Sequence, residues 1–183
     1  MKTISVVAIA GNKTEEHLLA MDPTTQQLPY PCQKILFSVS PPAAQTDVKW
    51  LPLDDWGTDR KNYVYQSGNF ILRKLFQYLD TDVCILVQAD GFATNKMAWT
   101  DEFLDWDYIG AVLPLWETIC LQGDKRRRVV SGGFNLRSRK FLEVSLNSPI
   151  LNPTITEDIS TTRINHKYFE KLGCHFAPID IAL

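Results

Sequence analysis

Asp82-Val-Cys-Ile-Leu-Val-Gln-Ala-Asp-Gly91 carries the clearest strand signal of this chain and decides its fold class. Residues 83–87 are all apolar, a pattern typical of a strand covered on both faces. The run stops at an acid followed by a glycine, a pairing that favours a turn. Strands covered on both faces lie in the middle of mostly parallel sheets with helices on either side.

The rest of the sequence alternates strand and helix patterns around this segment. Apolar residues of Asn62–Leu79 fall at spacings of three and four, and Asp59 or Asn62 can cap the resulting helix. The other expected helices are Lys13–Met21, Ser138–Leu146 and Thr156–Leu172, with a helical turn at Trp99–Leu104. The other expected strands are Ile4–Ala10, Lys34–Val39, Val48–Leu53, Tyr108–Leu113, Val129–Leu136 and Cys174–Ile181. This alternation predicts an α/β domain with a mostly parallel sheet.

Length and composition narrow the class of protein. The 183 residues fit one domain, 1–183, and the net charge of −2 lacks the basic excess expected of a duplex-binding protein, so no nucleic-acid partner is expected. No apolar run approaches the roughly 18 residues that a membrane span needs. The four cysteines form no CxxC or Cys/His cluster, which favours buried thiols in a reducing compartment. The first apolar run is short for a signal peptide, so we expect a strand there and a cytoplasmic protein.

The first candidate site residue is Asp90. Ligands of open α/β sheets bind at the carboxyl ends of the strands, where Asp90 is expected. A carboxylate on a rigid central strand can hold a divalent cation through hard oxygen ligands. The same residue could equally be the first polar residue of an Asp-Gly turn.

A second candidate is Gly132-Gly133 in the segment Ser131–Arg139. Two glycines allow the backbone to approach a ligand closely, although a bulge or a tight turn in a strand gives the same pattern. The segment is neither a dinucleotide fingerprint nor a P-loop.

The third candidate is the acid pair Glu157-Asp158 at the start of the late helix. Acids in a first helical turn complement the helix dipole, which is sufficient reason for their presence. A carboxylate there could also accept a proton from an attacking hydroxyl group.

A fourth feature is the basic run Lys125–Arg128 within the long connection 114–128. Such a run is usually a solvated surface, but it could clamp a diphosphate or contact an anionic acceptor.

Taken together, six motifs in order resemble a known family. The sequence from Asn62 onward resembles short glycosyltransferase-like proteins with the GT-A fold of nucleotide-diphospho-sugar transferases. The motifs are Val87-Gln-Ala-Asp-Gly-Phe92, Ala98-Trp-Thr-Asp-Glu-Phe-Leu104, Asp107-Tyr-Ile-Gly110, Gly132-Gly-Phe-Asn-Leu-Arg-Ser-Arg-Lys140, Glu157-Asp158 and Phe176-Ala-Pro178. The resemblance implies a three-layer α/β/α sandwich and a glycosyltransferase that moves a sugar from a nucleotide-diphosphate donor to a hydroxyl acceptor, such as a carbohydrate.

The resemblance also implies roles for individual residues. GT-A enzymes usually carry an Asp-x-Asp that holds Mn²⁺ or Mg²⁺ against the diphosphate, whereas this sequence has Gln88-Ala-Asp90 with one acid. Asp90 is the implied metal ligand, and Gln88, Gly91, Gly132 and Gly133 are the implied donor-site neighbours. Asp158 is the implied catalytic base, with Glu157 second. The single acid leaves open an alternative, a non-catalytic GT-A-like domain that binds a sugar or a partner protein.

Overall fold

The central element of the protein is a six-stranded sheet. The computed structural model describes residues 2–116, 122–151 and 154–183. The sheet order is β3-β2-β1-β4-β6-β5, and β1 pairs in parallel with both β2 and β4. Only β6 runs against its neighbours, so the sheet is mostly parallel, as predicted. The strands are β1 (Ile4–Gly11), β2 (Cys32–Ser38), β3 (Lys49–Pro52), β4 (Val83–Val87), β5 (Tyr108–Val112) and β6 (Val129–Ser138).

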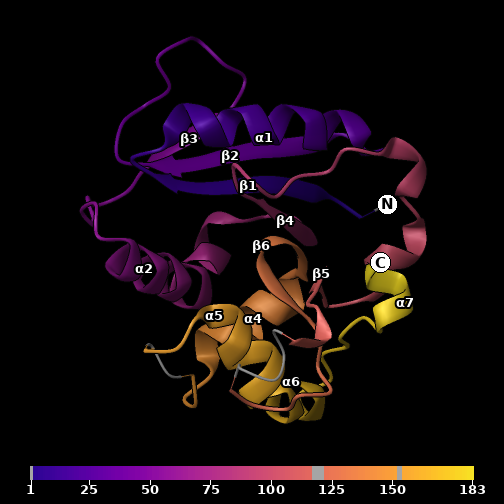
Figure 1. The fold of residues 1–183 in the computed structure, drawn as a ribbon. Helices are drawn as coiled ribbons and strands as arrows, with labels where there is room; N and C mark the ends of the chain where they lie inside the picture. The colour runs from indigo at the N-terminus through magenta and orange to yellow at the C-terminus, as the bar shows by residue number, and fades with distance from the viewer. Residues whose placement is uncertain (1, 117–121, 152–153) are drawn as a thin grey trace.

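Helices cover both faces of the sheet. Figure 1 shows α1 on one face and α2, α4, α5 and α6 on the other, which makes the three layers of an α/β/α sandwich. The α-helices are α1 (Thr14–Gln27), α2 (Arg60–Arg73), α4 (Arg139–Asn147), α5 (Glu157–Ile159), α6 (His166–Lys171) and α7 (Ile179–Ala182). The 3₁₀ segments are η1 (Leu75–Tyr78), η2 (Lys96–Ala98) and η3 (Asp101–Asp105).

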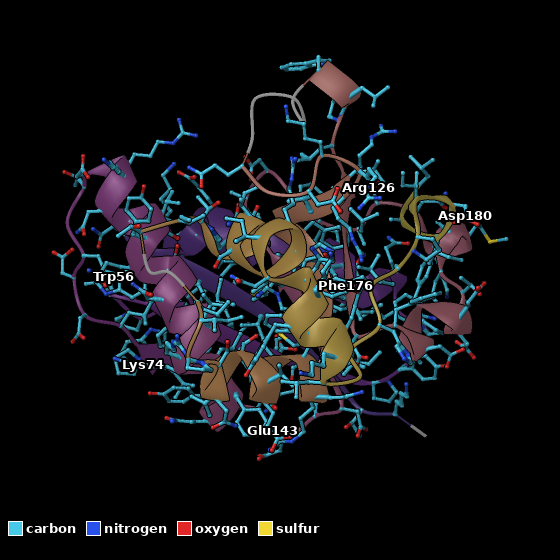
Figure 2. The ribbon with its side chains drawn as sticks, turned by 90° about the horizontal axis from the view of Figure 1, so that it is seen from below. Trp56, Lys74, Arg126, Glu143, Phe176 and Asp180 are labelled. Carbon is cyan, nitrogen blue, oxygen red and sulfur yellow. The ribbon has the colours of Figure 1, made fainter. Side chains whose placement is uncertain are left out.

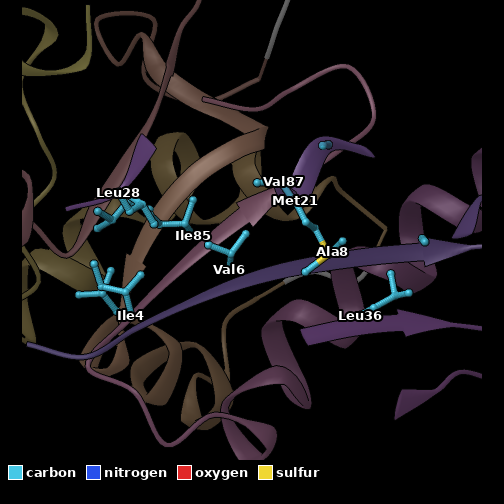
Figure 3. Close-up of a cluster of buried hydrophobic side chains, with 12 residues drawn as sticks. Ile4, Val6, Ala8, Met21, Leu28, Leu36, Ile85 and Val87 are labelled. Carbon is cyan, nitrogen blue, oxygen red and sulfur yellow. The ribbon is translucent and has the colours of Figure 1, made fainter. Parts of the chain in front are cut away.

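The two faces of β1 pack into separate apolar clusters. Successive side chains of a strand point to opposite faces, so Ile4, Val6 and Ala8 share one face of β1 and belong to a cluster that includes Met21 of α1 and Leu28, as Figure 3 shows. Val7 and Ile9 face the opposite cluster, which includes residues of α2 and α4. All eight residues of β1 are buried, and all but Ser5 are apolar or glycine, so a nearly continuous apolar run and not an alternating one marks this strand.

Local sequence signals explain where several helices begin. Asp59 caps α2, since its carboxylate accepts a hydrogen bond of 2.7 Å from the backbone N–H of Asn62. Ser138 caps α4 in the same way, with 3.0 Å from the Phe141 N–H to the Ser138 hydroxyl. Both helices therefore begin close to their predicted positions.

The prediction for the late helix was partly wrong. Instead of one helix over 156–172, the chain forms α5, a π-helical segment η4 (Ser160–Ile164) and then α6. The Asn165 N–H bonds the Ser160 carbonyl five residues back, which is the π-helical spacing. Thr156 makes no side-chain capping bond.

Other boundaries also differ from the prediction. Helix α2 ends at Arg73 and the 3₁₀ segment η1 follows it, where one helix to Leu79 was expected. The expected strand Cys174–Ile181 is reduced to one bridge between Phe176 and Tyr108, after which α7 begins. Helix α1 continues to Gln27, past the predicted end at Met21 and through Pro23. Cys120 and part of the connection 114–128 lie outside the described residues.

Candidate functional site

Strand β4 ends in a tight turn that presents Asp90. The N–H of Gln88 bonds the Gly91 carbonyl at 3.0 Å, and the Gly91 N–H bonds the Gln88 carbonyl at 3.0 Å. Gln88 and Asp90 are exposed, while every residue of β4 is buried. The structure therefore places the Asp90 carboxylate in solvent at the carboxyl edge of a central strand.

Gly132 and Gly133 bulge out of strand β6 beside this turn. The β5–β6 ladder steps from Gly110–Asn135 to Ala111–Ser131, so residues 132–134 have no partner in β5. A Cβ atom added to Gly91 would lie 3.2 Å from the carbonyl carbon of Gly133. Glycine at position 91 thus lets the turn after β4 contact the bulge.

The acid pair at the start of α5 reaches the other side of the bulge. One carboxylate oxygen of Asp158 accepts a hydrogen bond of 3.1 Å from the Gly132 N–H, and the other accepts one of 2.8 Å from the Ile159 N–H. A Cβ atom added to Gly132 would lie only 2.5 Å from Oε1 of Glu157. Three motifs that are distant in sequence therefore meet at one edge of the sheet.

Glu157 and Asp158 have different environments. Glu157 is buried and its Oε1 lies 2.7 Å from a terminal nitrogen of Arg137, whose side chain is fully buried. Burial raises the pKa of the Glu157 carboxyl, and the positive charge of Arg137 opposes that rise. Asp158 is only half-buried, so it is the acid of the pair that an incoming hydroxyl group can reach.

A buried polar network fixes the shape of the bulge. Arg137 Nε donates to the Asn135 side-chain oxygen at 2.7 Å, and the Asn135 amide donates to the Gly132 carbonyl. The Arg137 guanidinium also lies 5.3 Å from the ring centre of Tyr108, whose hydroxyl donates to the Val130 carbonyl at 2.6 Å. Backbone groups of the bulge are thus held by side chains on both sides.

Sequence reasoning assigned no role to Arg137, Asn135 or Tyr63. Asn135 and Arg137 flank Leu136 on β6, and two buried polar residues at alternate positions of a strand are the signal that could have revealed the network. Tyr63 of α2 donates its hydroxyl to the Ile9 carbonyl at 2.5 Å, and burial raises its pKa to about 12. Its ring fills the space beside Gly11, where a Cβ atom would lie 2.6 Å from Cε2.

The crevice between the ends of β1 and β4 is narrow. A cavity of about 20 Å³ lies there, lined by Ile9, Ser67, Ile71, Leu86, Val87, Gln88 and Gly132. This volume holds about one water molecule. A nucleotide at this edge would have to lie over the cavity, or the side chains that line it would have to move.

The residues around Asp90 supply few metal ligands. Within residues 2–116, 122–151 and 154–183, no three His, Cys, Asp or Glu side chains are grouped to hold a metal ion. Mg²⁺-type sites use one or two carboxylates, with substrate phosphates and water as further ligands. Asp90 therefore fits a cation that arrives with a diphosphate and does not fit one held by protein ligands alone.

His17 of α1 lies within electrostatic range of Asp90. Burial lowers the pKa of His17, while its hydrogen bond to the Lys13 carbonyl and the charges of Glu16 and Asp90 oppose that shift. The ring is thus a buried imidazole whose Nδ1 atom already has a backbone partner.

The basic run borders a larger cavity. Arg126, Arg127 and Arg128 line a cavity of about 290 Å³ together with Thr162 and residues 176–179. The run is therefore neither a purely solvated surface nor part of the crevice beside β4.

A comparison with solved structures identifies the fold. The structure resembles a mannosyltransferase, PcManGT from Pyrobaculum calidifontis, solved in complex with GDP-Man and Mn²⁺. The TM-score is 0.57 at 10% identity, over 98% of this chain and 55% of that one. The predicted glycosyltransferase-type α/β fold is thus confirmed, and the chain spans about half the length of this relative.

The sequence comparison then gives the family. The model of the family described as Protein of unknown function (DUF5672) matches residues 61–178, so the chain belongs to that family. No curated protein matches the chain. Every helix in the described part of the chain is too short or too polar to span a bilayer.

Proposed function

We propose that this chain is a glycosyltransferase that moves a sugar from a nucleotide-diphosphate donor to a hydroxyl acceptor, with residues 1–183 as one GT-A-like unit. The observation that carries the proposal is the meeting of the Asp90 turn, the Gly132-Gly133 bulge and Asp158 at the carboxyl edge of the sheet. The resemblance of the fold to a mannosyltransferase supports the same class of reaction.

Asp158 is the proposed catalytic base. Its two backbone hydrogen bonds fix the orientation of the carboxylate, and each oxygen keeps a lone pair for an acceptor hydroxyl. The acceptor oxygen forms the new bond to the anomeric carbon, the bond from that carbon to the diphosphate breaks, and the hydroxyl proton moves to Asp158. The nucleoside diphosphate leaves with the electron pair of the broken bond.

Asp90 is the proposed contact to the donor diphosphate. Through a cation that accompanies the donor, Mn²⁺ or Mg²⁺, Asp90 would hold the diphosphate; the cation would neutralise charge on the leaving group. Gln88, Gly91, Gly132 and Gly133 lie around the same point and would shape the backbone there. Glu157 would contribute indirectly, because its ion pair with Arg137 supports the bulge.

A non-catalytic sugar-binding or partner-binding domain is the second candidate. The narrow crevice of about 20 Å³ and the single acid at Asp90 favour it. The cytoplasm remains our proposed location for either candidate, based on the scattered cysteines.

The test combines donor binding and transfer. A thermal-shift screen of GDP-sugars and UDP-sugars, with and without Mn²⁺, should find a donor that raises the Tm. Asp90→Asn should remove that shift, whereas Asp80→Asn, a change of the same kind at an exposed residue before β4, should keep it. A flat response over a broad donor panel would contradict the proposal.

A second pair of variants separates the enzyme from the binding domain. Asp158→Asn should retain the donor-induced Tm shift and lower transfer or donor hydrolysis by about 10²–10⁴-fold, the usual effect of losing a general base. Glu143→Gln on the exposed face of α4 is the matched control. Donor binding without turnover in the unmodified chain would favour the non-catalytic candidate.

A further inference from the structure

The cavity beside the basic run has one basic wall and one apolar wall. Of the described residues that line it, three are arginines and none is acidic. The apolar wall is Phe176, Ala177, Pro178 and Ile179. Figure 2 labels Arg126 and Phe176, which belong to these two walls. Its volume of about 290 Å³ lies just below the range for small-molecule sites, about 300–1,000 Å³.

Two of the three arginines are already neutralised by protein carboxylates. Arg126 lies 2.8 Å from Asp124 and also bonds it through Nε, and Arg127 pairs with Glu170. The Arg127 guanidinium lies 5.5 Å from the ring centre of Phe176, so it also packs against the apolar wall. These two side chains shape the cavity.

Arg128 is the arginine left with bonding capacity. Its Nε donates to the Leu113 carbonyl at 2.9 Å, which anchors the guanidinium at the end of β5. Its two terminal nitrogens make no hydrogen bond or ion pair with any residue that the structure describes. A half-buried guanidinium whose two terminal nitrogens can still donate hydrogen bonds is suited to bind a phosphate or carboxylate group.

The cavity adjoins the proposed base. Strand β6 runs antiparallel to β4, so its first residues, Val129 onward, lie at the edge where β4 ends. Val129 lines the cavity, and Gly132, three residues further on, bonds Asp158. Thr162, which also lines the cavity, donates to the Asp158 carbonyl at 2.6 Å from the next helical turn.

We infer that this cavity binds the acceptor and that the acceptor is an anionic, sugar-sized molecule. Its phosphate or carboxylate group bonds the terminal nitrogens of Arg128, its ring lies on the apolar wall at Phe176, and a hydroxyl group extends toward Asp158. The inference rests on the proposed function and adds the chemical class of the acceptor.

Binding without donor tests the inference directly. Isothermal titration of the full chain with glucose 6-phosphate, glucuronate and glucose should show binding of one or both anionic probes and at least tenfold weaker binding of glucose, since hydrogen bonds to charged groups are the strong ones. The two anionic probes distinguish phosphate from carboxylate. Equal affinities for all three probes, or no binding of either anion, would overturn the inference.

Variants assign the effect to Arg128. Arg128→Gln removes the charge while its amide can still donate to the Leu113 carbonyl, and it should weaken anion binding about tenfold or more. Lys125→Gln removes the same charge from an exposed neighbour and should change the affinity less than twofold. Equal losses of anion affinity in both variants would indicate a general attraction to positive charge and would contradict a specific site at Arg128.

The outcome is separable from that of the proposed function. Anion binding that depends on Arg128, in a chain that binds no nucleotide sugar, would contradict only the proposed transfer. Transfer that depends on Asp158, with no preference for anionic acceptors, would contradict only this inference.

Discussion

The two halves of the sheet have different kinds of interior. The half built on β3, β2, β1 and β4 buries apolar side chains on both faces, and among the described residues before Asp107 no Asp, Glu, Lys or Arg is buried. The half built on β6, β5 and the later helices buries Asp107, Arg137, Glu157 and Arg163. The first half is stabilised by the burial of apolar side chains. The second half also buries charged side chains, and some of these fix the shape of the candidate site.

This difference has an energetic consequence. An apolar core tolerates substitutions that keep its volume, whereas a buried ion pair fails when one partner is removed. Oε2 of Glu157 and one terminal nitrogen of Arg137 are buried and have no hydrogen-bond partner among the described residues, so burial of this pair carries a desolvation cost. Such a cost in stability is expected at a functional site, where side chains are arranged for function as well as for stability.

The largest expected effect comes from breaking the buried pair. Arg137→Ala should lower the free energy of unfolding by about 3–5 kcal/mol, because it leaves the Glu157 carboxylate buried without a partner. Urea denaturation measures the change. Arg126→Ala, at a side chain that is 86% exposed, should leave the free energy of unfolding nearly unchanged. The comparison fails if the two variants are equally stable, or if the double variant Arg137→Met with Glu157→Leu is less stable than Arg137→Ala.

A cavity in the apolar half should come next. Leu36→Ala should cost about 2–5 kcal/mol, because the side chain is fully buried in β2. Leu36→Met keeps the volume and should cost less than about 1.5 kcal/mol. Equal losses of stability for Leu36→Met and Leu36→Ala, measured by the same denaturation, would show that the first half tolerates substitution no better than the second half.

The contact between bulge and acid pair should give a smaller effect. Gly132→Ala places a Cβ atom 2.5 Å from Glu157 Oε1 and should cost about 1–3 kcal/mol through overpacking. Gly91→Ala meets its nearest atoms at 3.2 Å, where shifts of a few tenths of an ångström suffice, and should cost less. Thermal denaturation of both variants checks the order, and a Gly91→Ala loss larger than that of Gly132→Ala would contradict it.

The smallest effect concerns the pH dependence of the apolar half. Burial lowers the pKa of His17 from 6.5, so below pH 6.5 the unfolded chain binds a proton that the folded chain does not. His17 should therefore reduce stability as the pH falls from 6.5 toward its folded pKa. His17→Gln should flatten the pH dependence of the free energy of unfolding in that window. An unchanged slope in the variant would show that the His17 ring is not buried as a neutral group.

Local signals in the sequence predicted most of the elements. The apolar run of residues 83–87 and the helical spacing from Asn62 depend on neighbouring residues only, and both appear in the structure. The late helix was wrong because side-chain hydroxyl groups compete there for the helical carbonyls, and the strand at 174–181 was wrong because its pairing depends on a distant segment. Hydroxyl groups of Thr161 and Thr162 bond the carbonyls of Glu157 and Asp158 at the π-helical segment, and Phe176 pairs with the edge of β5.

The candidate site was predicted as separate motifs. Asp90, Gly132-Gly133 and Glu157-Asp158 each had an alternative explanation in the sequence, and none of the motifs showed that they touch. Their meeting depends on β6 lying next to β4 in antiparallel register and on the bulge that lifts residues 132–134 out of the ladder. Sheet order is a long-range property, so the spacing of residues along the chain does not reveal it.

The sequence by itself determined the class of fold, the central strand ending at Asp90, and the residue types available for phosphate and proton chemistry. Only the tertiary structure distinguishes Glu157 from Asp158: it buries Glu157 against Arg137 and leaves Asp158 within reach of solvent. The physical reason is the distance along the chain over which each kind of interaction acts. Propensity and periodicity act between neighbours, whereas desolvation and ion pairing depend on every group that folding brings within a few ångströms.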